Sequence, residues 1–87
     1  MLEKRIYSPW AYMGNENEKY KMNQEIYQEI KNKAEVNCVG VTSRSKKYEV
    51  ISNPHNLTPE ELALICDSGN LCFGYRTEGR YIVVHTD

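Results

Sequence analysis

Apolar side chains recur at helical spacing in the stretch that begins at Met22. Met22, Ile26, Ile30 and Ala34 are four residues apart, and Tyr27 lies on the same side. This spacing predicts an amphipathic helix that begins after Asn23, its N-cap, and runs to residue 35, with the Gly14–Glu18 stretch before it as a loop. The opposite face is polar and is expected to contact water; it carries Glu25, Gln28, Lys31, Asn32 and Glu35.

After Glu35 the apolar period falls to two residues. Val36–Thr42 is rich in β-branched residues, and Lys47–Ser52 follows it across the polar connection Ser43–Lys46. Two such runs joined by a short polar segment predict a β-hairpin. Asn53–Asn56 should end the second strand, because its proline has no backbone donor for a sheet.

The next element starts with helix-capping residues. Thr58 is a suitable N-cap, Pro59 stands at the first helical position, and Glu61 is placed to complete a capping box. Gly69 is expected to supply the left-handed residue that ends this helix. The apolar face of the predicted helix consists of Leu62, Ile65 and Cys66, with Ala63 at its margin.

The last part of the chain predicts a second hairpin. Leu71–Arg76 alternates as a strand, Thr77–Gly79 is a short turn, and Arg80–His85 returns. Leu71, Phe73 and Tyr75 should share one face. The run Tyr81–Val84 is apolar on both faces, which favours an inner position in the sheet.

These elements predict an α+β fold in the order α-β-β-α-β-β, with a mainly antiparallel sheet of four strands and two helices on one of its faces. Arg5–Tyr7 could add a short N-terminal strand. With 87 residues, the chain is expected to be a single domain spanning residues 1–87. Residues 1–21 are treated as an aromatic N-terminal segment whose order the sequence leaves open.

Charge and apolar content narrow the function classes. The chain has 11 Lys and Arg against 12 Asp and Glu, a net charge of −1, so no global field attracts it to nucleic acid or an anionic membrane. It contains no apolar run long enough to span a membrane and no secretory signal pattern. Three cysteines at no disulfide-scaffold spacing favour reduced thiols. Together these features predict a cytoplasmic protein.

Residues Leu62–Gly69 resemble the motif helix of the LAGLIDADG homing endonucleases. The resemblance covers only this stretch and would imply a nuclease core built from helices and hairpins. Gly69 stands where that family has its acidic metal ligand, and Leu64 stands where it has a helix-packing glycine. No nuclease site is therefore carried over to this chain.

Other catalytic or metal sites find little support in the sequence. Cys38, Cys66 and Cys72 with His55 or His85 supply zinc-ligand types but form no Cys-x2-Cys pair. Cys72 and His85 fall on one predicted hairpin, where cross-strand polar neighbours are usually structural. We therefore predict no catalytic residue, no metal site and no cofactor, and a protein that is not an enzyme.

Basic residues gather at the two predicted hairpin tips. If both tips lay at one end of the sheet, they would form a basic rim able to touch phosphates, with Tyr48 and Tyr75 as stacking partners. Weak nucleic-acid binding is thus the alternative function. Its candidate residues are Arg44, Lys46, Lys47, Arg76 and Arg80.

Aromatic content favours protein binding as the leading hypothesis. Seven tyrosines and one tryptophan are more than a small core readily hides, and tyrosine is enriched at interfaces. The chain is expected to be a small interaction module, of the size of the accessory or inhibitor proteins that phages and mobile elements encode. Alternatively, a homodimer interface would bury the aromatic side chains that the core does not. The candidate binding residues are Tyr7, Trp10, Tyr12 and Tyr20.

Overall fold

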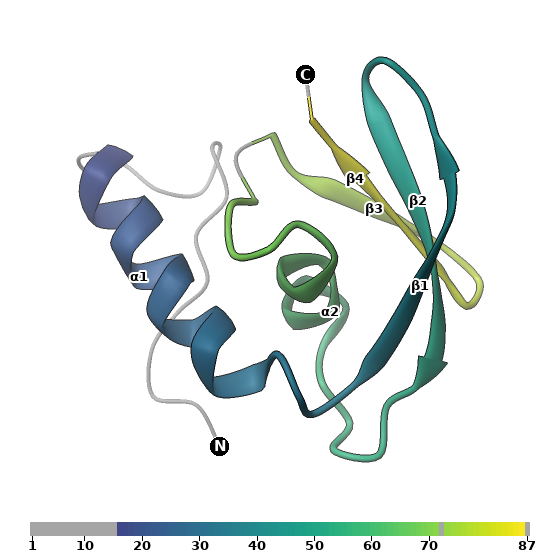
Figure 1. Cartoon of the computed structure of the whole chain (residues 1–87), viewed down its shortest axis with the longest axis horizontal. Coiled ribbons are helices and arrows are strands. Elements are labelled where there is room, and N and C mark those ends of the chain that lie inside the picture. Colours follow the sequence, from purple (N-terminus) through teal and green to yellow (C-terminus); the bar gives the residue numbers. More distant parts are fainter. Residues whose placement is uncertain (1–15, 72, 87) are drawn as a thin grey trace.

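The computed structural model describes residues 16–71 and 73–86. Its elements are α1 (Glu16–Ile30), β1 (Glu35–Val41), β2 (Ser45–Ser52), α2 (Pro59–Cys66), β3 (Tyr75–Glu78) and β4 (Tyr81–His85) (Figure 1). The predicted α+β class and element order are confirmed. The strand predicted at Arg5–Tyr7 lies outside the described residues. Among the helices described, neither has the length and apolar content that a membrane span requires.

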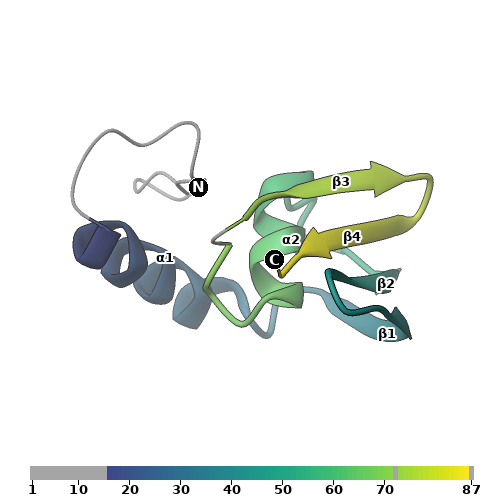
Figure 2. The same cartoon turned by 90° about the horizontal axis from the view of Figure 1, so that it is seen from above.

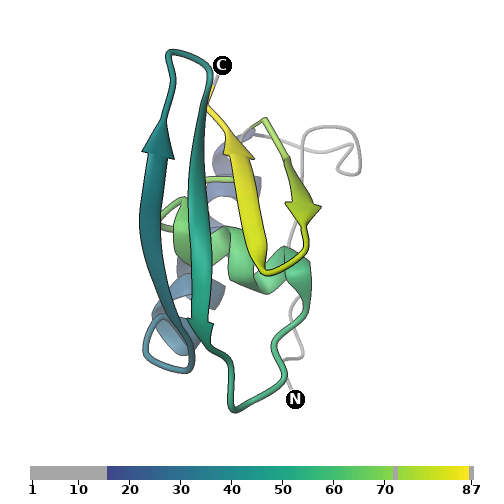
Figure 3. The same cartoon turned by 90° about the vertical axis from the view of Figure 1, so that its right-hand side faces the viewer.

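The four strands form one antiparallel sheet in the order β1-β2-β4-β3 (Figure 3). Each hairpin pairs its own two strands, and β2 joins the hairpins by pairing with β4. The inner position predicted for Tyr81–Val84 is confirmed, and Ile82, Val83 and Val84 are buried. β1 and β3 are therefore the two edges of the described sheet.

The helices form two successive layers on one side of this sheet. α2 packs against β4, β1 and β3, and α1 packs against α2 (Figures 1 and 2). Both helices lie on the same side of the sheet, as expected, but only α2 covers it closely. The domain therefore has three layers rather than the two that the sequence suggests.

The middle position of α2 explains why its apolar residues are not confined to one face. Leu62, Leu64 and Cys66 are all buried, and so is Ala63. Successive helical residues are about 100° apart, so Leu62 and Leu64 point to nearly opposite sides of the helix. The predicted face omitted Leu64, because a helix covered by only one layer would leave that side exposed.

The start of α2 is confirmed in detail, whereas its end differs from the prediction. The Thr58 hydroxyl accepts a hydrogen bond from the Glu61 backbone N–H at 3.2 Å, and the Glu61 carboxylate accepts one from the Thr58 N–H at 2.9 Å. At the other end Ser68, with φ 54°, is the first left-handed residue, and Gly69 follows it with φ 87°. The Gly69 N–H donates to the Leu64 carbonyl, as in a Schellman motif.

α1 begins and ends earlier than predicted. Glu16–Glu18, expected in a loop, are helical, and the helix stops at Ile30, before Ala34. Asn23 is not the N-cap: it lies in the middle of the helix, fully buried, and its side-chain amide donates to the Asn70 carbonyl at 3.2 Å. Asn23 thus attaches α1 to the loop after α2. Glu25 and Gln28 of the predicted polar face are exposed on α1. The other three residues, Lys31, Asn32 and Glu35, are also exposed but lie beyond the end of the helix, and Glu35 belongs to β1.

The strand predicted from Leu71 starts only at Tyr75. Leu71 is buried with φ 48°, and its N–H donates to the Asp67 carboxylate, so the backbone turns here instead of extending. Phe73 is 50% exposed and does not share a buried face with Leu71. The turn of this hairpin is Gly79–Arg80, one residue later than expected, and Gly79 has the predicted positive φ of 63°.

Candidate functional site

The side of the sheet that faces away from the helices carries two of the five candidate basic residues, Lys47 and Arg76. We call it the outer face and define it by Lys47, Glu49, Arg76, Glu78, Tyr81 and Val83. Register places Lys47, Val83 and Arg76 in one row across three strands, and Glu49, Tyr81 and Glu78 in the next. Because side chains alternate along a strand, these two rows point to the same side.

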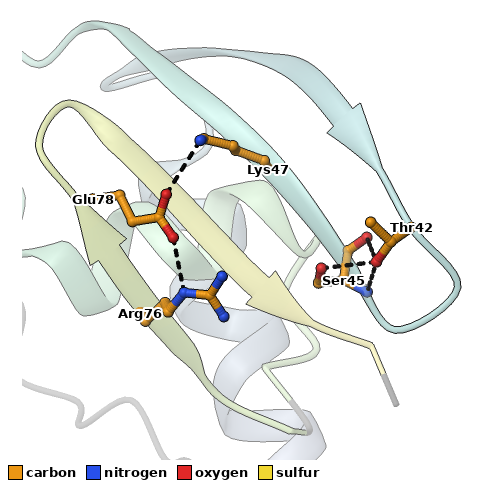
Figure 4. Close-up of polar contacts among 5 residues, drawn as sticks. All are labelled: Thr42, Ser45, Lys47, Arg76 and Glu78. Carbon is orange, nitrogen blue, oxygen red and sulfur yellow. Dashed lines mark hydrogen bonds and ion pairs between the residues drawn. The ribbon is translucent and has the colours of Figure 1, made fainter.

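Glu78 forms ion pairs with two of the candidate basic residues (Figure 4). Its carboxylate lies 3.2 Å from the Lys47 ammonium and accepts a 2.9 Å hydrogen bond from the Arg76 guanidinium. These hydrogen bonds, first that from Arg76 and then that from Lys47, lower the pKa of Glu78 from its ordinary value. Lys47 also stands 4.7 Å from the centre of the Tyr81 ring. Lys47 and Arg76 are thus engaged within the sheet.

A further ion pair and a buried valine complete the outer face. Arg80, in the turn between β3 and β4, lies 3.4 Å from the Glu49 carboxylate. Val83 is only 3% exposed although it points away from the helices. Its row neighbours Lys47 and Arg76 flank it with long aliphatic stems, which cover apolar surface while the charges stay in water. This face is a solvated, largely ion-paired surface.

The two hairpin tips lie at opposite ends of the sheet. Ser45, beside the first tip, pairs with His85, whereas Glu49 pairs with Tyr81 beside the second tip. Arg44 therefore lies far from Arg80, and the continuous basic rim considered from the sequence does not form. Arg44 and Lys46 are exposed near the first tip. There the Thr42 hydroxyl accepts a hydrogen bond from the Ser45 N–H, which Figure 4 shows, and one from the Arg44 N–H.

The two edges of the described sheet differ sharply in chemistry. β3 has four residues and carries the ion-paired Arg76 and Glu78. β1 has seven residues, and from Val36 to Val41 it contains neither a charge nor a proline. Short length and charges are the usual devices that keep an edge strand from pairing with another chain. β3 has both, whereas β1 has neither between Val36 and Val41 and carries a different protective device, a β-bulge at Val39.

β1 also exposes large apolar side chains. Val39 is 47% exposed and Val41 65%, and Ile51 on the neighbouring β2 is half-exposed. Val39 has no partner residue in β2, because the register shifts between Cys38 and Gly40. Such a bulge turns a side chain outward and shortens the regular ladder. We call Val36–Val41 the open edge of the sheet.

Only one of the four aromatic candidates lies in the described part of the chain. Tyr20, on α1, is half-exposed, and Tyr7, Trp10 and Tyr12 fall outside the described residues. The structure adds Phe73, which is exposed in the loop before β3. The sequence does not indicate that Phe73 is exposed, because its alternating neighbours predict a strand with Phe73 on the same face as Leu71 and Tyr75. It does not indicate the open edge either, because strand order cannot be inferred from the sequence.

The described cysteines differ in exposure and do not gather with other metal-ligand types. Within residues 16–71 and 73–86, no group of three or more His, Cys, Asp or Glu side chains is placed to hold a metal ion. Cys66 is buried in the core, and Cys38 is exposed on the open edge. Burial, followed by the nearby Asp67 carboxylate, raises the pKa of the Cys66 thiol to about 12. Cys72 lies outside the described residues.

We expect thiol alkylation to separate these two cysteines. At pH 8 the folded chain should be labelled at Cys38, while Cys66 should react at least about 1000-fold more slowly, because its pKa of about 12 leaves little thiolate and burial excludes the reagent. Time-resolved maleimide labelling with peptide mapping by mass spectrometry measures each site. In denaturant the two rates should converge. Fast labelling of Cys66 in the folded chain would contradict its place in the core.

Searches against protein-family models, curated proteins and solved structures found no match to this chain.

Proposed function

We propose that this protein is a small protein-interaction module that binds an extended segment of its partner at the open edge. In strand addition, backbone hydrogen bonds supply affinity, and contacts to alternate side chains supply selectivity. The observation that carries the proposal is the contrast between the edges: β3 is short and charged, whereas Val36–Val41 is uncharged and exposes Val39 and Val41.

The electrostatics of the outer face favour a protein partner over nucleic acid. Lys47, Arg76 and Arg80 each contact a carboxylate of the sheet, so phosphate binding there would have to compete with Glu49 or Glu78. Arg44 and Lys46 are two exposed cations at one tip. A nucleic-acid binder of this size would normally show net positive charge, whereas this chain carries −1. Nucleic-acid binding stays the alternative prediction.

The proposed biological setting rests on size and chemistry alone. A chain of 87 residues with an interaction edge and no predicted catalytic group suits an accessory or inhibitor protein, such as those that phages and mobile elements encode. In that setting, strand addition would let a minimal domain occupy or complete the sheet of a larger protein.

Affinity capture from native cell extract, with and without nuclease, tests the proposal. Val39→Lys places a charge on the open edge, and Thr77→Lys places the same charge on the exposed part of β3. We expect the wild type and the Thr77→Lys variant to capture the same protein in a stoichiometric amount, and Val39→Lys to lose at least about 90% of it, because a buried lysine opposes strand addition.

Several outcomes would contradict the proposal. Unchanged capture by Val39→Lys would exclude the open edge as the binding site. Capture that disappears with nuclease, and falls with Arg44→Ala and Lys46→Ala, would establish the nucleic-acid alternative instead. Circular dichroism of each variant checks that folding is intact, and an exposed substitution should change stability by less than about 0.5 kcal/mol.

A further inference from the structure

We infer that the segment which pairs with the open edge is the same edge of a second copy, so that two chains form one continuous antiparallel sheet. This inference rests on the proposed function: a second copy pairs with the open edge in the free protein, and a larger partner would have to displace that copy. It concerns Glu35–Val41 and the adjoining tip at residues 42–44. In Figure 3, β1 forms the border of the described sheet and no described strand lies beyond it.

The charge pattern around β1 is self-complementary only in the antiparallel sense. Glu35, at the start of the strand, is exposed, and Arg44 is exposed at the tip that follows its end. If two copies pair antiparallel with Val39 near the twofold axis, Glu35 of each copy lies beside Arg44 of the other. Parallel pairing would instead place like charges together, which is unfavourable. Lys33 and Arg44 lie in the turns before and after β1, so Glu35 is the charged residue of the strand itself that the opposite Arg44 can meet.

The apolar residues agree with the same arrangement. A twofold axis at Val39, perpendicular to the sheet, brings the exposed Val39 of one copy against Val39 of the other and places Val41 opposite the uncharged Asn37. It opposes no like charges between Val36 and Val41. Such an axis keeps both helix layers on one side of the joined sheet. The result is an isologous interface, the commonest kind in soluble homodimers.

Sedimentation equilibrium of the purified full chain, from micromolar to near-millimolar concentration, tests the inference with a charge swap. We expect a reversible dimer whose dissociation constant rises about tenfold in Glu35→Lys and in Arg44→Glu, since each dimer holds two such pairs. The double variant Glu35→Lys with Arg44→Glu should return to within about threefold of the wild type. Val39→Lys should be monomeric, and Thr77→Lys should dimerise like the wild type.

Crosslinking adds a geometric readout. Cys38 is exposed next to the inferred axis, so a short bis-maleimide should join Cys38 of one copy to Cys38 of the other, and Cys38→Ser should abolish that crosslinked peptide. The inference is wrong if the chain stays monomeric at every concentration. It is also wrong if the charge-swap variants and Val39→Lys leave the dissociation constant of a dimer unchanged. If a monomeric chain still captures a different protein in a manner sensitive to Val39→Lys, the proposed function stands and only the self-pairing fails.

Discussion

Leu64→Ala is expected to lower the free energy of unfolding by about 2–5 kcal/mol, the range for deleting a buried leucine side chain. Leu64 is 0% exposed and belongs to the core cluster that joins α1, α2 and the sheet. Because α2 is covered on both sides, its neighbours cannot close the cavity without shifting another layer. For a domain of this size, the loss is a large share of the whole stability.

Urea unfolding followed by circular dichroism measures this effect. Ile51→Ala is the matched control, because it removes a side chain of the same volume from a half-exposed position and should cost less than about 1 kcal/mol. If Leu64→Ala cost no more than Ile51→Ala, α2 would be covered on one side only, and the three-layer arrangement would be wrong.

Features set by neighbouring residues could be predicted from the sequence. The capping box of Thr58 and Glu61, the positive φ of Gly79 and the two hairpins all depend on side chains within a few positions of each other. The apolar run Tyr81–Val84 also indicated an inner strand correctly. An apolar run on both faces is typical of an inner strand, and β4 does lie between β2 and β3.

Features set by tertiary contacts could not be predicted in the same way. The sequence favours Asn23 as a cap because asparagine usually stays out of helix interiors, but in the fold its buried side-chain amide donates a hydrogen bond to the Asn70 carbonyl. The helix extends back to Glu16 through residues such as Glu18 and Lys19 that favour helices but show no apolar period.

The candidate site depends on the same non-local information. Val36–Val41 was recognised as a strand, but its exposure follows from strand order, which places β1 at an edge and β4 inside. The basic residues were also recognised, yet their separation follows from the antiparallel pairing of β2 with β4. Residue chemistry was thus readable from the sequence, whereas the surfaces on which that chemistry is displayed were not.

The contact between α1 and the turn after α2 leads to a second expected result: Gly69→Ala should destabilise the domain by about 3 kcal/mol. Gly69 has φ 87°, where an alanine is strained, and an added Cβ would lie 3.0 Å from the Tyr27 Cβ and 2.6 Å from the Gln24 amide nitrogen. Gln24 donates to the Ser68 carbonyl at 2.9 Å, so moving its side chain would also disturb that hydrogen bond.

Gly79→Ala separates the two causes of this loss. Gly79 also has a positive φ, of 63°, but an added Cβ there meets nothing within 4 Å. Gly79→Ala should therefore lower the free energy of unfolding only by the cost of holding an alanine in left-handed backbone geometry, about 1–2 kcal/mol. Chemical denaturation of both variants gives the difference, which measures how tightly α1 rests on the turn. Equal losses of unfolding free energy in the two variants would mean that α1 shifts at little cost to accommodate a side chain at residue 69. In that case α1 would contribute little to the cooperative unfolding of α2 and the sheet.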